Sequence, residues 1–261
     1  MGSRASTRKT KKTTTRRGVA GALLAGALVA TGGIVAVPAL TAQPAQAATG
    51  LAVKLAWSKN FGIAGKPVAK SSPMVATLDS KGSSVLIGDR AGYERAFHLS
   101  DGTNVSGWPV STGGIPVDST ASVLGSGSTA RVFFGEGNSG SPTRGGYRAI
   151  TAAGHLAWSV KPAGQPGKAA TVGVMTGLAI GNMQSNASVI GGAMGQTQDL
   201  IDAATGKVGR GFPWFEADTN FTTPAVSDLG IGGRDVIVEG ATPPRESRSA
   251  SATRTAATCG S

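Results

Sequence analysis

Short apolar segments recur along the chain at a nearly constant interval, and their pattern is typical of β-strands rather than helices. Each repeat holds a small-residue segment with a central valine, then an apolar segment that ends in glycine, then a third segment that leads into a turn and a large aromatic residue. Short apolar or alternating runs bounded by Gly, Pro and Ser are typical of strands. The pattern therefore predicts about four short strands per repeat.

The large aromatic residues define the period. The tetrapeptide LAWS at 55–58 recurs at 156–159, GWP stands between the two copies at 107–109, and GFP follows at 211–213. The successive aromatic residues are 51, 50 and 54 residues apart. Four strands in about 50 residues, with one large aromatic per unit, are typical of a β-propeller blade. We expect an all-β propeller of four-stranded blades, here about three and a half blades, with the aromatic residues packed between adjacent blades.

Two further positions mark each repeat. The first strand of each repeat is expected to contain a valine, and the second strand is expected to end at a glycine. The valines are Val75, Val123, Val174 and Val226, and the glycines are Gly88, Gly135, Gly192 and Gly240. Turn pairs that end in glycine follow the third strands, because glycine accepts a positive φ at little cost: Asp101-Gly102, Ala153-Gly154 and Thr205-Gly206.

The repeats resemble two known families. Residues 199–214, DLIDAATGKVGRGFPW, are similar to the repeat of quinoprotein-type (PQQ-like) propellers, in which an Ala-x-Asp-x-x-x-Gly-Lys turn precedes a tryptophan. Residues 71–88 and 222–240 resemble the FG-GAP or VCBS repeats of integrin-like extracellular propellers, with a Ser-Pro-x-Val strand, a loop and a Val-Val-Gly strand. The resemblance covers residues 51–240 and implies a propeller. It leaves function open, because both families include enzymes, adhesins and modules with no known activity.

The first 47 residues are typical of an export signal. Residues 1–17 carry seven basic side chains and no acid, an apolar Gly/Ala-rich run follows from 18 to 40, and Ala45-Gln46-Ala47 supplies the small residues of a cleavage site. We expect cleavage after Ala47 and a secreted protein. A membrane anchor is the alternative, because the apolar run is long enough to span a bilayer. Its glycines and Pro38 favour removal. General secretion and a twin-arginine route through Arg16-Arg17 both remain open.

Most of the excess positive charge belongs to this leader. The whole chain has a formal charge of +11, but the part after residue 47 has 18 basic and 14 acidic residues, with no run of Lys or Arg. Nucleic-acid binding needs clustered basic residues, so we exclude it. The single cysteine, Cys259, excludes an intramolecular disulfide.

The chain divides into a signal peptide at 1–47, a partial propeller at 48–240 and a foreign tail at 241–261. The tail has three arginines, no aromatic residue and no strand pattern. Two interpretations of it stay open: a disordered tail, or a frameshift that truncates the propeller. An unclosed propeller would expose sheet edges, so we expect the protein to associate through them.

Two loops contain aspartates that are candidate calcium ligands. The first loop offers Asp79, and the fourth offers Asp228 and Asp235. Calcium loops usually present three or more oxygen ligands, whereas each of these has one or two carboxylates beside an opposing Lys81 or Arg234. We therefore expect solvated turns and no cofactor, with calcium at these aspartates as the alternative.

One segment suggests hydrolase chemistry. Residues 137–142, GNSGSP, resemble the nucleophile loop of trypsin-like serine proteases. Ser139 would be the nucleophile, His98 the base and Asp118 the orienting acid, in the chain order of that family. Against this, only 41 residues separate His98 from Ser139, and the repeat runs straight through the segment.

The sequence therefore favours an exported, non-enzymatic β-propeller module that binds an extracellular protein or glycan and has no stable membrane anchor. The alternatives are a secreted quinoprotein-like propeller enzyme and a serine hydrolase that uses Ser139. A binding surface is expected in the loops 79–82, 137–146 and 228–235. Which of these loops share a face is not evident from the sequence.

Overall fold

The computed structural model describes residues 53–61, 70–164, 166–167, 171–215, 222–228, 235–240 and 253–255. All of them belong to one compact unit, Val53–Ser261. The predicted signal peptide at 1–47, with its cleavage site after Ala47, lies outside the described residues. Within the described ranges, no helix is long and apolar enough to cross a membrane.

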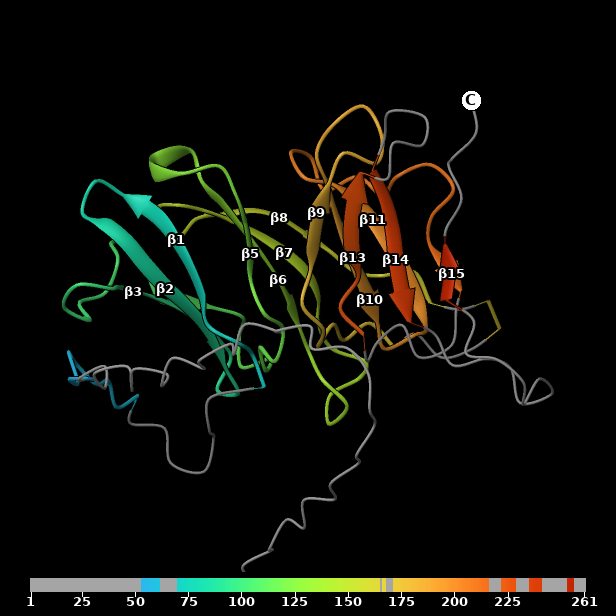
Figure 1. Cartoon of the computed structure of the whole chain (residues 1–261). Helices are drawn as coiled ribbons and strands as arrows, with labels where there is room; N and C mark the ends of the chain where they lie inside the picture. Colours follow the sequence, from blue (N-terminus) through green and yellow to red (C-terminus); the bar gives the residue numbers. More distant parts are fainter. Residues whose placement is uncertain are drawn as a thin grey trace, which may run out of the picture. The chain divides into compact units, whose positions relative to one another are not determined.

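The described chain forms successive four-stranded antiparallel sheets, each built from consecutive strands (Figure 1). We call them blades 1, 2 and 3. Blade 1 contains β1 (Met74–Asp79), β2 (Gly82–Asp89), β3 (Tyr93–His98) and β4 (Val110–Ser111). Blade 2 contains β5 (Ser122–Leu124), β6 (Arg131–Glu136), β7 (Gly146–Thr151) and β8 (Leu156–Val160). Blade 3 contains β9 (Ala179–Gly181), β10 (Ser188–Ala193), β11 (Thr197–Asp202) and β12 (Trp214–Phe215). A short 3-10 helix, η1 (Gly127–Thr129), precedes β6. The predicted all-β fold of four-stranded propeller blades is confirmed.

A fourth sheet follows blade 3. It contains β13 (Ala225–Asp228), β14 (Asp235–Gly240) and β15 (Thr253–Thr255). The first two strands are those expected for a fourth blade. β15 lies inside the segment 241–261, which the sequence placed outside the propeller, and its backbone pairs with β14.

The first strand of blade 3 differs from the prediction. Val174 was expected in that strand, but β9 begins at Ala179, and Ile180 pairs with Val189 as Val123 pairs with Val132 in blade 2. Val174 instead lies fully buried in the linker that enters the blade, against Gly135, as Val117 lies against Gly88. The segment around Val174 resembles a first strand in sequence but precedes that strand.

The glycines near the ends of β2 and β6 have a packing role. A Cβ atom on Gly88 would lie 2.4 Å from the carbonyl oxygen of Val117, and one on Gly135 would lie 2.3 Å from Cγ1 of Val174. Each valine belongs to the linker that enters the next blade. Glycine is therefore required where this linker crosses the second strand.

Tryptophan side chains join one blade to the next. The indole nitrogen of Trp108, just before β4, donates to the carbonyl oxygen of Ala152 at 2.9 Å, and that of Trp158 on β8 donates to Ala203 at 3.0 Å. Both acceptors lie in the turn after the third strand of the following blade. The expected packing of aromatic residues between blades is confirmed for these two residues.

Trp57 makes the same contact with blade 1. Its indole nitrogen donates to the carbonyl oxygen of Leu99 at 2.8 Å, and its ring lies against Gly102. Residues 53–61 therefore pack on blade 1 as the fourth strand of blade 1 packs on blade 2. They form no strand themselves.

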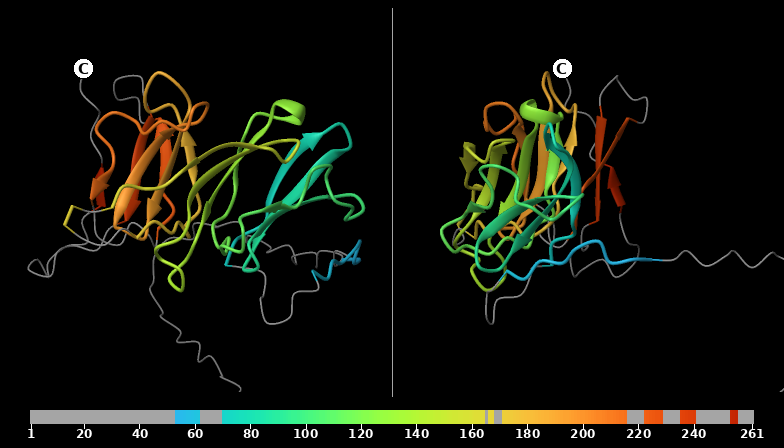
Figure 2. Two further views of the ribbon diagram at one scale, coloured as in Figure 1. Left: turned by 180° about the vertical axis from the view of Figure 1, so that it is seen from behind. Right: turned by 90° about the vertical axis from the view of Figure 1, so that its left-hand side faces the viewer.

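The apolar core lies between the blades. One cluster combines Leu86 of β2 with Val132 and Phe134 of β6, and a second combines Phe133 of β6 with Val189 of β10. A smaller cluster joins blade 3 to β14. The blades follow one another in chain order in the two further views (Figure 2).

Candidate functional site

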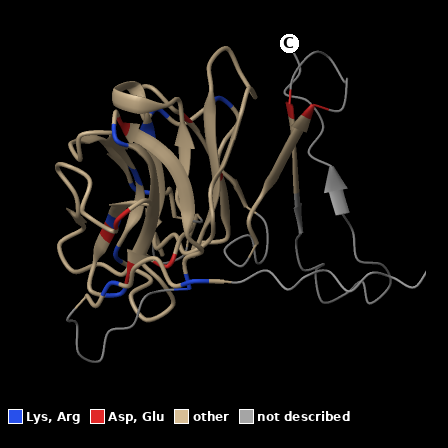
Figure 3. Ribbon diagram, turned by 60° about the vertical axis from the view of Figure 1, so that its left-hand side comes forward, with Lys and Arg blue, Asp and Glu red and all other residues tan. Residues whose placement is uncertain are grey.

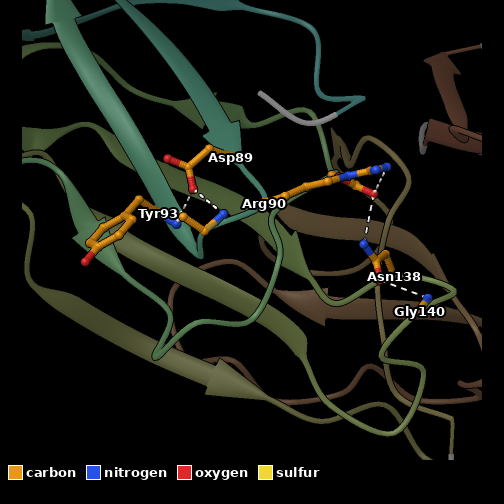
Figure 4. Close-up of polar contacts among 7 residues, drawn as sticks. Asp89, Arg90, Tyr93, Asn138 and Gly140 are labelled. Atoms are coloured by element: carbon orange, nitrogen blue, oxygen red, sulfur yellow. Dashed lines mark hydrogen bonds and ion pairs between the residues drawn. The ribbon is translucent and has the colours of Figure 1, made fainter. Parts of the chain in front are cut away.

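A polar cluster joins three loops at the end of the blades where the second strand finishes. Arg90, in the turn between β2 and β3, donates from Nε and a terminal nitrogen to both carboxylate oxygens of Asp118, each at 2.9 Å. Asn138, in the loop between β6 and β7, donates to Oδ2 of Asp118 at 3.2 Å (Figure 4). Asp118 lies in the linker between the two blades and is only 3% exposed. One buried carboxylate therefore ties together loops from both blades.

The Arg90 side chain keeps 35% of its surface exposed. Its hydrogen bond to the Asp118 carboxylate, together with the attraction of that charge, raises the pKa of the guanidinium further. Arg90 is thus a fixed cation at the surface of this end of the blades, held in one orientation by a bidentate contact.

Asp89 shapes the neighbouring turn. Its Oδ1 accepts hydrogen bonds from the backbone N–H groups of Ala91 and Tyr93, at 2.9 and 3.1 Å (Figure 4). Its Oδ2 pairs with Nε of Arg95 at 2.6 Å. Asp89 is fully buried, so this pairing offsets the cost of removing its charge from water.

Blade 2 repeats this pairing. Glu136 ends β6 as Asp89 ends β2, and it pairs with Nε of Arg148 at 2.7 Å. Burial raises the pKa of Glu136, and the charge of Arg148 opposes that rise. The recurrence of a carboxylate after the glycine and an arginine on the third strand is a sequence signal that would have located these pairs.

In blade 3, an aspartate, Asp199, stands on the third strand where blades 1 and 2 carry Arg95 and Arg148. Asp199 accepts hydrogen bonds from the Tyr147 hydroxyl at 2.9 Å and from the Thr197 hydroxyl at 3.1 Å. Both donors are neutral, so burial dominates and raises the pKa of Asp199 to about 6. The Tyr147 hydroxyl oxygen also lies 2.8 Å from the carbonyl oxygen of Gly191, so its single proton is shared between two acceptors of blade 3.

The three candidate hydrolase residues are placed apart. His98 pairs with Ser84 near the start of β2, whereas Val117, next to Asp118, bonds to Asp89 at the end of that strand. These two points are five positions apart along β2, which corresponds to roughly 16 Å.

His98 instead lies with its Nε2 3.5 Å from Oδ2 of Asp79. Asp118 is held by Arg90 and Asn138, and Ser139 lies in an exposed turn beside Asn138. The structure thus brings Asp118 near the loop of Ser139 but does not place His98 as a base for that serine.

The candidate calcium residues each have protein contacts. Oδ1 of Asp79 accepts the backbone N–H of Lys81 at 2.9 Å, and Oδ2 of Asp235 accepts that of Asn182 at 2.6 Å. The backbone of Asp228 pairs with that of Asp235 in the ladder between β13 and β14. Among the described residues, no group of three or more His, Cys, Asp or Glu side chains is placed to hold a metal. Calcium at these aspartates stays a hypothesis.

Two of the three loops proposed for binding lie at different ends of their blades. The turn at 79–82 precedes β2, at the end opposite Arg90. Most of the third loop, 228–235, lies outside the described residues. The loop at 137–146 follows β6, so it lies at the end that holds Arg90 and Asp118. Across the described residues, acidic and basic positions both occur along the ribbon at either end of the blades (Figure 3).

Neither a protein-family model nor a curated protein matches the chain. Among solved structures, it is similar to the quinohemoprotein alcohol dehydrogenase from Comamonas testosteroni, with 16% identity, a TM-score of 0.42, and coverage of 60% of this chain and 30% of that chain. It is also similar to the quinohemoprotein alcohol dehydrogenase ADHIIG from Pseudomonas putida HK5, with 17% identity, a TM-score of 0.40 and coverage of 60% and 30%.

A third similar structure is BBS1N in complex with ARL6DN, with 12% identity, a TM-score of 0.44, and coverage of 71% of this chain and 52% of that chain. The chain spans between about a third and about half of the length of these proteins. Likeness at this level concerns fold alone. The propeller architecture rests on the consecutive four-stranded sheets and the contacts between them.

Proposed function

We propose that the chain is an exported β-propeller module that binds an extracellular protein or glycan and carries out no chemistry on it. The observation that supports this most is the Arg90–Asp118–Asn138 cluster. Asp118 holds the β2–β3 turn, the linker into blade 2 and the β6–β7 loop in one arrangement. A surface that is already ordered loses little conformational entropy on binding, which favours affinity.

The charged groups at this end are engaged in contacts that stabilise the fold. Asp89 pairs with Arg95, and Glu136 pairs with Arg148. These contacts support a rigid binding surface. The exposed part of Arg90 and the exposed loop around Ser139 would contact the ligand.

Export is tested first. We expect a bacterial host to release the protein with Ala48 as its first residue, because the small residues at 45 and 47 form the cleavage site. Mass spectrometry of the N-terminal peptide from the culture medium measures this. A protein retained in the membrane with its leader intact would favour the anchor.

Binding is tested on the secreted protein against a panel of extracellular glycans and matrix proteins. Asp118→Asn is expected to weaken any binding at least tenfold, since it removes the charge that orients Arg90. Asp101→Asn is the control, because Asp101 is also a hydrogen-bonded aspartate outside the strands but lies at the other end of blade 1.

Three outcomes would overturn this assignment. Ester or peptide hydrolysis that is lost in Ser139→Ala would establish the hydrolase instead. Saturable binding of pyrroloquinoline quinone with dye reduction would establish the quinoprotein alternative. Ligand binding that is unchanged in Asp118→Asn would move the binding surface elsewhere.

A further inference from the structure

One equivalent position near the start of the second strand carries an arginine in blade 2 and a serine in blades 1 and 3. This position pairs with the end of the third strand in each blade: Ser84 with His98, Arg131 with Thr151, and Ser188 with Asp202. The position lies at the end of the blades opposite the Arg90 cluster. The residues at this position can therefore be compared for how they fill the space between successive blades.

In blade 2, Arg131 reaches across to blade 3. One of its terminal nitrogens lies 2.9 Å from the carbonyl oxygen of Ala204 and 3.3 Å from that of Ala203. The indole of Trp158 donates to the same Ala203 oxygen. A guanidinium and an indole from blade 2 thus share the carbonyl groups of one turn in blade 3.

Between blades 1 and 2, the equivalent residue is Ser84, whose side chain is too short to reach the next blade. A cavity of about 510 Å³ lies between these two blades. Its wall includes Ala152, the counterpart of Ala203, and the next residue of the turn, Ala153. Trp108 donates to the Ala152 oxygen as Trp158 does to Ala203, which confirms the equivalence.

The cavity is rich in hydrogen-bond acceptors. Asp79 lines it with a side chain that is 29% exposed, together with Ser80, Ser106 and Ser128. Each carboxylate oxygen of Asp79 has one contact, with Lys81 N–H or His98 Nε2, and each can accept a further bond.

Leu78 and Val105 supply apolar walls. A carboxylate and serine hydroxyls beside apolar walls suit a flat cation that only donates hydrogen bonds.

A cation also reaches the corresponding turn of blade 1. Nζ of Lys59 donates to the carbonyl oxygen of Gly102 at 3.0 Å. Among the three described blades, the turns of blades 1 and 3 therefore receive a cationic side chain of the chain itself. The turn of blade 2 borders the cavity. At Ser188 in blade 3, the cavity is only about 150 Å³ and Asn186 bonds to Asp202, so we assign no ligand there.

We propose that the cavity between blades 1 and 2 binds the guanidinium group of an arginine side chain presented by a partner polypeptide. Arg131 shows the geometry, in which the group meets the two turn carbonyls of the next blade. Asp79 adds a charge-assisted contact. The site lies at the opposite end of the blades from the Arg90 cluster and does not depend on the function proposed above.

The test uses the secreted protein and the peptide acetyl-Gly-Arg-Gly-amide, followed by NMR titration. The control peptide carries citrulline, which has nearly the shape of arginine but no charge. We expect the arginine peptide to bind at least tenfold more tightly. Equal affinity for the two peptides would overturn the proposal.

Two protein variants locate the site. Asp79→Asn is expected to weaken binding of the arginine peptide at least tenfold, whereas Asp202→Asn, which alters another turn-capping aspartate on blade 3, should leave it unchanged. The double variant Ser84→Arg/His98→Thr reproduces the residues of blade 2, so the chain's own guanidinium should fill the cavity and abolish binding. Binding that persists in Asp79→Asn would overturn the proposal, even if the double variant does not fold.

Discussion

At the scale of single residues, the buried carboxylates differ in how their charge is compensated. Asp89 has an arginine and two backbone N–H groups, and Asp199 has two hydroxyl donors. Glu94 is fully buried, and neither of its carboxylate oxygens has a hydrogen-bond partner in the structure. Burial, reinforced by the nearby charge of Asp89, raises the pKa of Glu94 well above its ordinary value. This shift favours the protonated form of Glu94 in the folded protein.

This predicts how stability depends on pH. The folded state holds a proton on Glu94 that the unfolded state releases above about pH 4.5, so the free energy of unfolding falls as pH rises beyond that point. Glu94→Gln removes this contribution, whereas Glu136 and Asp199, whose pKa values are also raised, keep theirs. We expect the variant to match the parent at pH 4 and to exceed it by about 1 kcal/mol or more at pH 8.

Urea unfolding at the two pH values measures the difference. Asp101→Asn is a control of opposite sign, because hydrogen bonds from Thr103 lower the pKa of Asp101 and its contribution is lost as pH falls. A Glu94→Gln variant that is equally affected at both pH values would show that folding does not raise the pKa of Glu94.

At the scale of elements, the end of the second strand and the linker into the next blade are fitted to each other. Gly135 has no space for a Cβ beside Val174. We expect Gly135→Ala to lower the free energy of unfolding by about 2 kcal/mol or more, because the contact is with backbone as well as with a side chain.

Gly140→Ala is the matched substitution. A Cβ there would meet only Oδ1 of Asn138, at 3.4 Å in an exposed turn. Thermal unfolding of both variants checks the prediction. Equal melting temperatures would mean that blades 2 and 3 separate at this point without cost.

The tryptophan contacts carry a second prediction at this scale. Trp158→Phe keeps the apolar ring but removes the N–H that bonds to Ala203. The loss of a buried hydrogen bond is expected to cost about 1–3 kcal/mol. Trp214→Phe should cost much less, because Trp214 lies on the short edge strand β12 and is 37% exposed. Urea unfolding followed by circular dichroism compares the two.

At the scale of the whole molecule, the two copies of LAWS differ in one respect. The copy at 156–159 lies in β8, which pairs with β7. The copy at 55–58 docks on blade 1 through Trp57 but belongs to no strand, and Leu55 is 76% exposed. Its backbone edge is therefore available to pair with another strand.

We accordingly expect the protein to associate at high concentration, and we expect Leu55→Lys to reduce that association. Leu156→Lys is the control, because Leu156 is also exposed but its strand is already paired. Sedimentation velocity over a wide range of concentrations measures this. A monomer at every concentration would contradict the prediction, as would an equal effect of the two variants.

The sequence by itself determined the repeat, the number of strands per blade and the role of the aromatic residues. These features are local: alternation along a strand, glycine at a turn and one tryptophan per unit each reflect contacts that recur in every blade. Asp118 was singled out from the sequence, but as a partner of His98. The structure gives it to Arg90 and Asn138.

Only the tertiary structure decided which residues meet across the blades. Such partners are about 50 residues apart, and small differences in turn and linker length change their alignment, as the shift from Val174 to Ile180 shows. For this reason the equivalence of Ser84 with Arg131 could not be inferred from the sequence. The cavity between blades 1 and 2 is likewise lined by residues of two blades that lie far apart in the chain.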